Sequence, residues 1–354
     1  MKIFSPALIR RTCQRALAAA LLISVMPASG QSPAVIARID TLIKTDLGRP
    51  FNGVILIARN GRILYSRCYG FSDAAHKIPL QSDEQFVIGS VSKQVTGVLV
   101  LQEAAEKHLD LQAPIGRYLH NIPQRWKDTV TVQHLLNHVS GIIWPDRPLA
   151  FKPGSQFAYS NIGYSLLGEI LEKVTGKPYN TLVADLFSKA GMRNSYAPGN
   201  KPIVLKSFLE DSTRQLIPTG ADVTFMKMLA PAGGIISNAR DLLLWNEALH
   251  NGRILPDSLY KIFTTSFSHR DHPTWGPVDY GDGIQIAHPG TLTELGHSGA
   301  ANMPAAATTC INFYYPATQT SVIVLENVSW DTRDMARAFV FEKKIRNMMV
   351  EDMK

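Results

Sequence analysis

The sequence predicts an α+β fold in which an antiparallel sheet, built from both ends of the chain, carries an inserted all-helical lobe. Alternating hydrophobic patterns near the N-terminus give way to helical periodicity after residue 90, and strand patterns return after residue 283. The strands come as hairpins, which join antiparallel neighbours. With 354 residues, 45% of them hydrophobic, the chain can bury a large core as one large domain or two lobes.

The first elements are a helix and a hairpin. Apolar residues at helical spacing predict a helix over residues 36–44. Residues 53–58 and 63–65 flank Asn60-Gly61, a dipeptide that favours a tight hairpin turn. Further helices are predicted over residues 91–107, 131–138 and 162–174. We therefore place an α/β lobe over about 31–89 and 216–354, and the helical lobe over about 90–215.

The last third of the chain returns to mixed structure. A predicted helix over residues 239–250 has Asn238 or Asp241 near its cap, and Asp331 is predicted to cap a closing helix over 331–349. Strands are predicted over residues 283–287, 294–299, 310–315 and 321–326, the last two joined by a turn over 316–320. We expect His269-Arg270-Asp271-His272 to form a polar loop rather than a metal site.

The first 30 residues have the pattern of a secretory signal peptide. A basic segment ends at Arg15, the uncharged stretch over residues 16–26 is too short to span a bilayer, and Ala28-Ser29-Gly30 offers small residues for cleavage. We expect an exported protein, periplasmic or secreted, whose mature domain covers residues 31–354. Arg10-Arg11 leaves twin-arginine export open beside the general route. No later run of 18 apolar residues suggests a transmembrane segment in the mature chain.

Composition argues against several partner classes. The formal charge of +7 includes four positive residues within residues 1–30, which leaves a mild +3 for the rest of the chain. No basic patch with interleaved aromatic residues suggests nucleic-acid binding. The mature chain keeps two cysteines, Cys68 and Cys310, which are too few for a disulfide scaffold, and it has no Cys–His cluster of zinc spacing. We therefore expect no metal, no cofactor and no nucleic-acid partner, and a small molecule or peptide as substrate.

Three short motifs carry the candidate chemistry, and the first is Ser90-Val91-Ser92-Lys93. Ser90 opens an apolar helix, and a helix N-terminus favours negative charge, both on a serine alkoxide and on the oxyanion of a tetrahedral intermediate. Lys93 shares a helix face with Ser90, and apolar surroundings help a lysine to lose its proton. The pattern fits a nucleophile and its base, whereas the alternative is a serine N-cap beside a surface lysine.

The S-x-x-K pattern occurs about once by chance in a chain of this length, so the context of each match decides. Ser258 and Lys261 form a second match, but they follow a polar turn over residues 251–257. We interpret Lys261 as a solvated surface charge. We favour Ser90 because its segment is apolar on most sides, as in a buried helix.

The second motif, Tyr159-Ser160-Asn161, precedes a predicted amphipathic helix. Tyr159 could shuttle a proton and Asn161 could hold a substrate amide, or Ser160 or Asn161 could simply cap the helix. The third motif, His297-Ser298-Gly299-Ala300, lies on a strand of small residues that lets a substrate backbone pair with it. Its alternative is a strand end with a hydrogen-bonded histidine. In this order, the three motifs support acyl transfer through a covalent serine ester.

Together the motifs resemble those of the serine β-lactamase and penicillin-binding protein superfamily, in its branch of class C β-lactamases, D,D-peptidases and esterases. The resemblance runs from Ile36 to the C-terminus and includes residues 135–142, 151–159, 174–179, 232–241 and 280–283. It implies a β-lactamase/transpeptidase-like fold with an antiparallel five-stranded sheet flanked by helices. In that sheet the strands of Cys68 and Cys310 are not neighbours, so both thiols should stay unpaired.

The resemblance also implies a role for each site residue. Ser90 would be the acylated nucleophile, Lys93 its base and Tyr159 a proton carrier in acylation or deacylation. The backbone N–H groups of Ser90 and Ala300 would form the oxyanion hole, and Asn161 would bind the acyl side-chain amide. The residues that would bind the substrate or the oxyanion are Asn161, His297, Ser298, Gly299 and Ala300.

The third motif departs from the β-lactamases, which carry lysine where this chain has His297. Histidine or tryptophan at this position resembles the peptidases and esterases of the branch. The sequence therefore predicts an exported, cofactor-free serine hydrolase that acts on an ester or amide, including a D-amino-acid peptide. Two alternatives stay open: a true β-lactamase, and a penicillin-binding or sensor protein that acylates without turnover.

Overall fold

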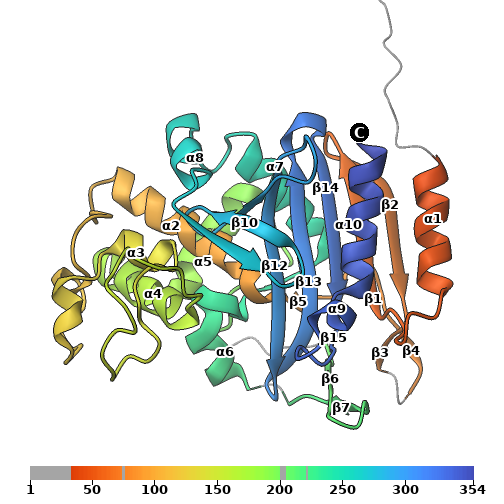
Figure 1. The fold of residues 1–354 in the computed structure, drawn as a ribbon, viewed down its shortest axis with the longest axis horizontal. Helices are drawn as coiled ribbons and strands as arrows, with labels where there is room; N and C mark the ends of the chain where they lie inside the picture. Colours follow the sequence, from red (N-terminus) through yellow and green to blue (C-terminus); the bar gives the residue numbers. More distant parts are fainter. Residues whose placement is uncertain (1–32, 74–75, 200–204, 221) are drawn as a thin grey trace, which may run out of the picture. The chain divides into compact units, whose positions relative to one another are not determined.

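A computed structural model describes residues 33–73, 76–199, 205–220 and 222–354, which belong to one compact unit. The predicted signal peptide lies outside the described residues. The centre of the unit is an eight-stranded sheet, antiparallel between all its neighbouring strands (Figure 1). In spatial order its strands are β2 (Arg62–Tyr69), β1 (Gly53–Arg59), β14 (Thr320–Glu326), β13 (Ala306–Tyr315), β12 (Glu294–Met303), β11 (Gln285–Ala287), β10 (Gly276–Tyr280) and β9 (Ser268–His272).

The sheet confirms the predicted fold class, but the expected count of five strands was wrong. The sheet continues beyond β12 through the three short strands β11, β10 and β9. The expectation of a polar loop at residues 269–272 was wrong as well, because these residues form β9. Two of its polar residues, His269 and Asp271, are exposed and alternate with more buried neighbours. An edge strand tolerates such polar residues because one side of it is open to solvent.

Three smaller pairings surround the main sheet. They are β15 (Val328–Ser329) with β6 (Phe208–Glu210) and β7 (Leu216–Pro218), β3 (Phe71–Asp73) with β4 (Ile78–Pro79), and β5 (Phe86–Val87) with β8 (Ile236–Ser237). Among the described residues the α-helices are α1 (Pro33–Lys44), α2 (Ser92–Ala105), α3 (Val132–Leu136), α4 (Asn161–Thr175), α5 (Tyr179–Ala190), α6 (Val223–Leu229), α7 (Ala239–His250), α8 (Asp257–Phe263), α9 (Met335–Ala338) and α10 (Val340–Asp352). None of these helices is long and apolar enough to cross a membrane.

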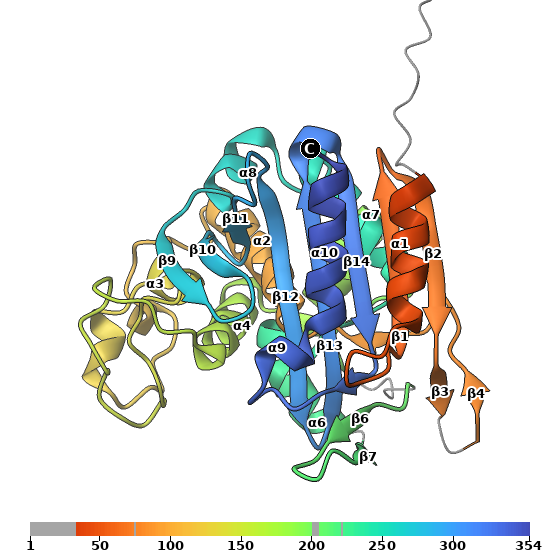
Figure 2. The same ribbon diagram turned by 45° about the vertical axis from the view of Figure 1, so that its right-hand side comes forward.

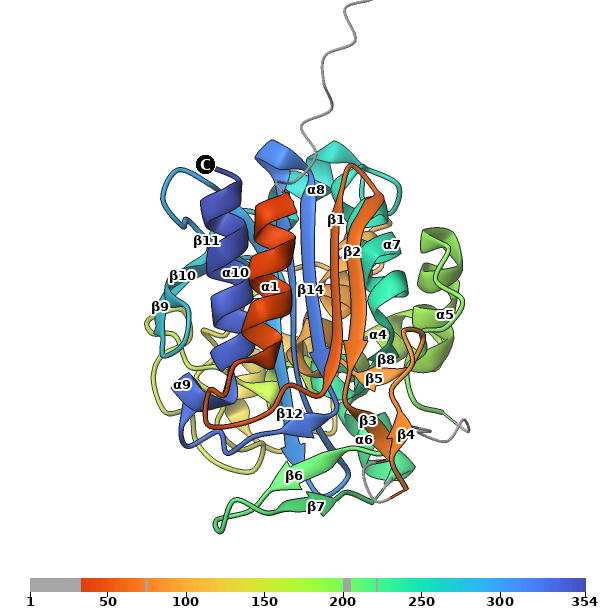
Figure 3. The same ribbon diagram turned by 90° about the vertical axis from the view of Figure 1, so that its right-hand side faces the viewer.

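Helices cover both faces of the sheet. α1 and α10 lie side by side on one face, and α7 lies behind the sheet on the other (Figures 2 and 3). Alternation along β1 explains this: Ile55 and Ile57 belong to the apolar cluster with α1 and α10, whereas Val54 and Leu56 belong to the cluster with α2 and α7. The strand is therefore apolar on both sides, as a central strand between two helical layers must be.

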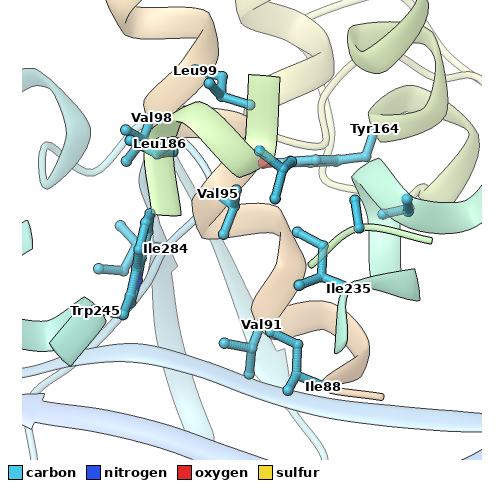
Figure 4. Packing of buried hydrophobic residues seen from close by; sticks show 14 of the residues in the cluster. Ile88, Val91, Val95, Val98, Leu99, Tyr164, Leu186, Ile235, Trp245 and Ile284 are labelled. Carbon is cyan, nitrogen blue, oxygen red and sulfur yellow. The ribbon is translucent and has the colours of Figure 1, made fainter. Parts of the chain in front are cut away.

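α2 runs through the middle of the helical part of the fold. Its residues from Ser92 to Leu101 are all buried, which confirms the prediction of a buried helix. Val95 and Val98 pack in one apolar cluster with Tyr164 of α4 and with Trp245 of α7 (Figure 4). This packing fixes the start of α2, where the first motif lies.

The predicted helices over residues 36–44, 91–107, 131–138, 162–174 and 239–250 are confirmed as α1, α2, α3, α4 and α7. α5 and α6 were not predicted, whereas α8 begins where a helix start is expected behind the polar turn over residues 251–257. The closing helix differs from its prediction because it is interrupted at Phe339 into α9 and α10. Asp331 does not cap it: its side chain binds Arg333, and Asp334 caps α9 by accepting from the backbone N–H of Arg337.

Candidate active site

Ser90 lies where β5 turns into α2 through a short 3₁₀ turn over Gly89–Val91. Gly89 has a φ of 52°, and a Cβ there would lie 2.7 Å from the backbone nitrogen of Ala300. Likewise, a Cβ on Gly299 would lie 3.1 Å from the backbone nitrogen of Ser90. Because both positions lack a Cβ, the turn can approach β12 this closely. The approach brings together the two backbone N–H groups that we predict to form an oxyanion hole.

Lys93 is completely buried one helical turn after Ser90. Its Nζ lies 3.1 Å from Ser90 Oγ, 2.8 Å from Asn161 Oδ1 and 2.6 Å from the backbone oxygen of Ala232. Burial lowers the pKa of Lys93 well below its ordinary value, and the positive charge of Arg270 lowers it further. A neutral amine has two N–H groups, which suit the two closest acceptors. Its lone pair then remains for the proton of Ser90.

Tyr159 is the second side chain that contacts Ser90. Its hydroxyl donates a hydrogen bond to Ser90 Oγ at 2.6 Å. The next residue fixes its place, because Ser160 caps α4 by accepting from the backbone N–H of Gly163 at 3.1 Å. Burial raises the pKa of the Tyr159 phenol above its ordinary value, so the phenol keeps its proton. Both interpretations of this motif are therefore compatible: Ser160 caps the helix, while Tyr159 contacts Ser90 and Asn161 contacts Lys93.

The third motif forms the part of β12 that lies beside Ser90. The His297 ring is 1% exposed, and its Nε2 lies 2.8 Å from the Tyr280 hydroxyl while its Nδ1 faces the backbone oxygen of Ser298. Burial lowers the pKa of His297 well below its ordinary value, so the ring is neutral. β11 pairs with β12 only as far as Gly296, and Ala300 further along is exposed. The residues that follow Gly296 therefore present a strand edge that a substrate backbone could join.

The structure adds site residues that the sequence analysis did not predict. The His138 ring packs 4.3 Å from the Tyr159 ring, and its Nδ1 accepts from the backbone N–H of Ser160 at 3.1 Å. Lys93 Nζ lies 5.3 Å from the centre of the Tyr164 ring, and Arg270 lies over the Tyr159 ring. The stretch over residues 135–142 contained His138, but nothing local in the sequence indicates that its φ is +58° or that it packs on Tyr159.

The second S-x-x-K match does not form such a site. Ser258 and Lys261 are both exposed on α8, which confirms the interpretation of Lys261 as a solvated surface charge. Within the described part of the chain, no group of three or more His, Cys, Asp or Glu side chains could hold a metal ion.

Comparison with known proteins agrees with this geometry. A family model described as β-lactamase matches residues 39–345. The chain belongs to the β-lactamase family. Among its relatives, PbpX of Bacillus subtilis (strain 168) is 27% identical over 300 residues, which cover 78% of this chain and 71% of PbpX. Esterase EstB of Burkholderia gladioli is 30% identical over 198 residues, which cover 45% of this chain but only 50% of EstB.

Solved structures of low sequence identity show the same fold. The octameric penicillin-binding protein homologue from Pyrococcus abyssi superposes with a TM-score of 0.74 at 24% identity, over 83% of this chain and 74% of that chain. The D-amino acid amidase from Ochrobactrum anthropi SV3 gives a TM-score of 0.74 at 19% identity, over 91% of this chain and all of the amidase. With its family established, this β-lactamase-family chain is a serine hydrolase of the acyl-serine type.

Proposed function

We propose that this β-lactamase-family protein is an exported hydrolase of ester or amide bonds, similar to esterases and D,D-peptidases, with Ser90 as its nucleophile. The observation that carries the proposal is the convergence of a buried amine and a half-buried phenol on one hydroxyl, at 3.1 and 2.6 Å from Ser90 Oγ. A relative named as an esterase and a structural neighbour named as an amidase support this bond class.

In acylation, Ser90 Oγ attacks the carbonyl carbon of the substrate and its proton passes to Lys93. The resulting ammonium has three N–H groups and three acceptors within reach, namely Ser90 Oγ, Asn161 Oδ1 and the Ala232 carbonyl. The negative charge that develops on the carbonyl oxygen is stabilised by the backbone N–H groups of Ser90 and Ala300. In the free enzyme, burial thus keeps Lys93 neutral, but the three acceptors can stabilise its ammonium form once it has taken the proton of Ser90.

The leaving group departs when the carbonyl bond to it breaks, and it needs a proton. Tyr159 is placed to donate one, because its phenol is protonated and lies against Ser90 Oγ. The proton that Lys93 took from Ser90 then passes to the phenolate, since Lys93 Nζ lies 4.7 Å from the centre of the Tyr159 ring. Deacylation reverses these transfers: water attacks the acyl carbon, its proton enters the same pair, and Ser90 recovers its hydrogen.

The neutral third motif favours esterase or peptidase activity over β-lactamase activity. His297 is buried and uncharged, so this position gives a substrate carboxylate no permanent cation. Efficient β-lactam turnover is therefore the second candidate. A protein that acylates without turnover is the third.

Peptide mapping tests the proposed nucleophile. After labelling with a fluorophosphonate or a penicillin, we expect the adduct on the Ser90 peptide, no adduct in Ser90→Ala, and normal labelling in Ser258→Ala. A labelled Ser258 peptide with unmodified Ser90 would overturn the assignment. Steady-state rates with p-nitrophenyl esters, D-alanyl-D-alanine peptides and a chromogenic cephalosporin then separate the three candidates, since a stable adduct without turnover identifies the third.

The proposal of export has its own test. The basic segment, the uncharged stretch and the small residues before residue 31 support it. N-terminal sequencing of the protein recovered from the periplasm or medium of the producing cells should begin at Gln31. Recovery of the intact N-terminus from the cytoplasm alone would contradict export.

A further inference from the structure

Arg270 brings a positive charge into the site from the far edge of the sheet. It lies on β9, and its half-buried side chain reaches back over the second motif. The guanidinium carbon is 5.2 Å from the centre of the Tyr159 ring and 5.6 Å from the centre of the Phe157 ring. The charge therefore lies over the ring whose hydroxyl is hydrogen-bonded to Ser90.

No protein carboxylate neutralises this charge among the described residues. The ion pairs there do not include Arg270, and its buried Nε has no hydrogen-bond partner. The acids around it are engaged elsewhere or point away. Asp279 pairs with His269, the Asp282 carboxylate accepts from Gln133 and Asn137, and Asp271 is exposed. A half-buried guanidinium with unused donors, over the ring of a tyrosine that contacts the nucleophile, is suited to an anion supplied from outside the protein.

We infer that Arg270 is a specificity-determining residue that binds a carboxylate of the substrate while Ser90 attacks the neighbouring carbonyl. The inference rests on the proposed function, since it needs Ser90 to be acylated. The planar guanidinium can receive both oxygens of a carboxylate at once. A substrate that pairs with the edge of β12 near Ala300 would run past Ser90 on the side of Tyr159 and Arg270. The site therefore prefers anionic over neutral acyl donors even though His297 is uncharged.

Cation–π packing on Tyr159 and Phe157 is the structural alternative for Arg270. It would make Arg270 matter equally for charged and neutral substrates, because both use Tyr159. The ratio of kcat/KM between an anionic substrate and its neutral isostere separates the two explanations. Losses that come from a displaced Tyr159 cancel in this ratio.

The experiment uses two matched ester pairs and the full mature protein. p-Nitrophenyl hydrogen succinate and p-nitrophenyl butyrate differ by a carboxylate in place of a methyl on the acyl side. 3-Acetoxybenzoate and phenyl acetate differ by a carboxylate on the leaving group. The variants are Arg270→Gln, the charge-conserving Arg270→Lys, and Arg62→Gln as a control that removes an exposed arginine at the opposite edge of the sheet.

In Arg270→Gln we expect the anionic-to-neutral ratio to fall at least about 10-fold for one of the pairs, which is typical of a lost hydrogen bond to a charged group. Arg270→Lys should retain part of the preference, and Arg62→Gln should retain all of it. Ratios within about two-fold of the parent for both pairs would overturn the inference while leaving the hydrolase intact. Absence of Ser90 acylation by all four esters would instead overturn the proposed function, and the inference with it.

Discussion

The phenol oxygen of Tyr159 lies 2.6 Å from Ser90 Oγ, closer than the Lys93 amine at 3.1 Å. Burial affects these two neighbours in opposite ways, because it raises the pKa of the phenol and lowers the pKa of the amine. Each group is thereby held in its neutral form. The phenol can only give a proton, whereas the amine can take one. The base and the acid of the proposed mechanism are therefore distinct residues that both contact the nucleophile.

Removing either group should reduce turnover strongly. We expect Lys93→Ala and Tyr159→Phe to lower acylation or deacylation rates by at least ~100-fold, as is typical of a lost proton-transfer group. Tyr159→Phe should be less harmful with p-nitrophenyl esters than with amides, since p-nitrophenolate departs without a proton. Rates with both substrate types measure this, and circular dichroism checks the fold. Lys261→Ala, which removes the exposed lysine of the second S-x-x-K match, is the matched control. Near-normal turnover in either site variant would exclude that residue as a proton carrier.

The pH dependence of kcat/KM should reveal the pKa of the buried Lys93 amine. Lys93 must be neutral to accept the proton of Ser90, so kcat/KM for a neutral ester should rise with pH and level off above the pKa of Lys93. An ordinary lysine would place this rise near pH 10.4, whereas burial places it well below that value. Removing the nearby positive charge in Arg270→Gln should shift the rise to higher pH. A profile from pH 5 to 10 measures both effects, and a rise centred at 10 or above would argue against Lys93 as the base.

Local spacing predicted which side chains meet around Ser90. Ser90 lies in the 3₁₀ turn that leads into α2, and Lys93 lies three residues on in the first turn of α2, so helical spacing places both on one face. Tyr159 and Asn161 flank a serine that caps the next helix, and the cap sets their directions. These relations depend on a few neighbouring residues, and such relations can be read from a single sequence. The antiparallel sheet was predictable for the same reason, since hairpins join neighbours in the chain.

Relations between distant segments were not predictable. Arg270 and Tyr159 lie 111 residues apart and meet only because β9 pairs with β10 at the edge of the sheet. β9 carries no apolar alternation, so its polar composition resembled a loop. His138 packs on Tyr159, and its backbone has a left-handed φ of 58°. The residue type alone does not predict this conformation. His297 was considered from the sequence, but the positive charge of Arg270 over Tyr159 was not predicted.

Asp282 makes stability depend on pH. Its Oδ1 accepts hydrogen bonds from Gln133 at 2.6 Å and Asn137 at 2.9 Å, whereas its Oδ2 is buried with no partner in the described part of the chain. Burial raises the pKa of Asp282 to about 7, above the value of about 3.9 in an unfolded chain. Between these values the folded protein holds a proton that the unfolded chain has released. Stability from this group is thus complete below pH ~4 and is lost as the pH rises through about 7.

Asp282→Asn should remove this pH dependence, since the amide cannot take up the charge. Its free energy of unfolding relative to the parent should increase by about 1–3 kcal/mol between pH 5 and pH 8.5. Urea unfolding at each pH measures the difference. Asp271→Asn changes an exposed carboxylate on β9 and should show no such trend. A difference that stays constant across the range would mean that Asp282 is already ionised at pH 5.

The two cysteines of the mature chain should both be free thiols. Cys68 lies exposed on β2 and Cys310 lies buried on β13, with β1 and β14 between them. Three strand spacings of about 4.8 Å exceed the Cα separation of about 7 Å that a disulfide tolerates. Burial also raises the pKa of the Cys310 thiol. Thiol titration should find one reactive group in the folded protein and two after denaturation, and none would refute this strand order.

His297→Lys tests whether the third motif faces the substrate. A lysine in contact with solvent or substrate at this position is a permanent cation, whereas the present histidine is neutral. We expect the variant to improve kcat/KM for penicillins relative to neutral esters and to flatten the pH dependence for anionic substrates. The measurement is the anionic-to-neutral ratio of kcat/KM from pH 5.5 to 8.5 in both proteins.

The buried environment of His297 also explains what an unchanged anionic-to-neutral ratio in His297→Lys would mean. Its ring is buried and hydrogen-bonded to Tyr280. It also lies close enough to Lys93 that a proton on either side chain disfavours a proton on the other. A lysine that stayed in this enclosed position would lose its proton and leave the ratio unchanged. That result would mean that the side chain at position 297 does not contact the substrate, and that Arg270 alone provides the positive charge that binds anionic substrates. Combining His297→Lys with Arg270→Gln decides the point, because a lysine that faces the substrate should restore part of the preference that Arg270→Gln removes.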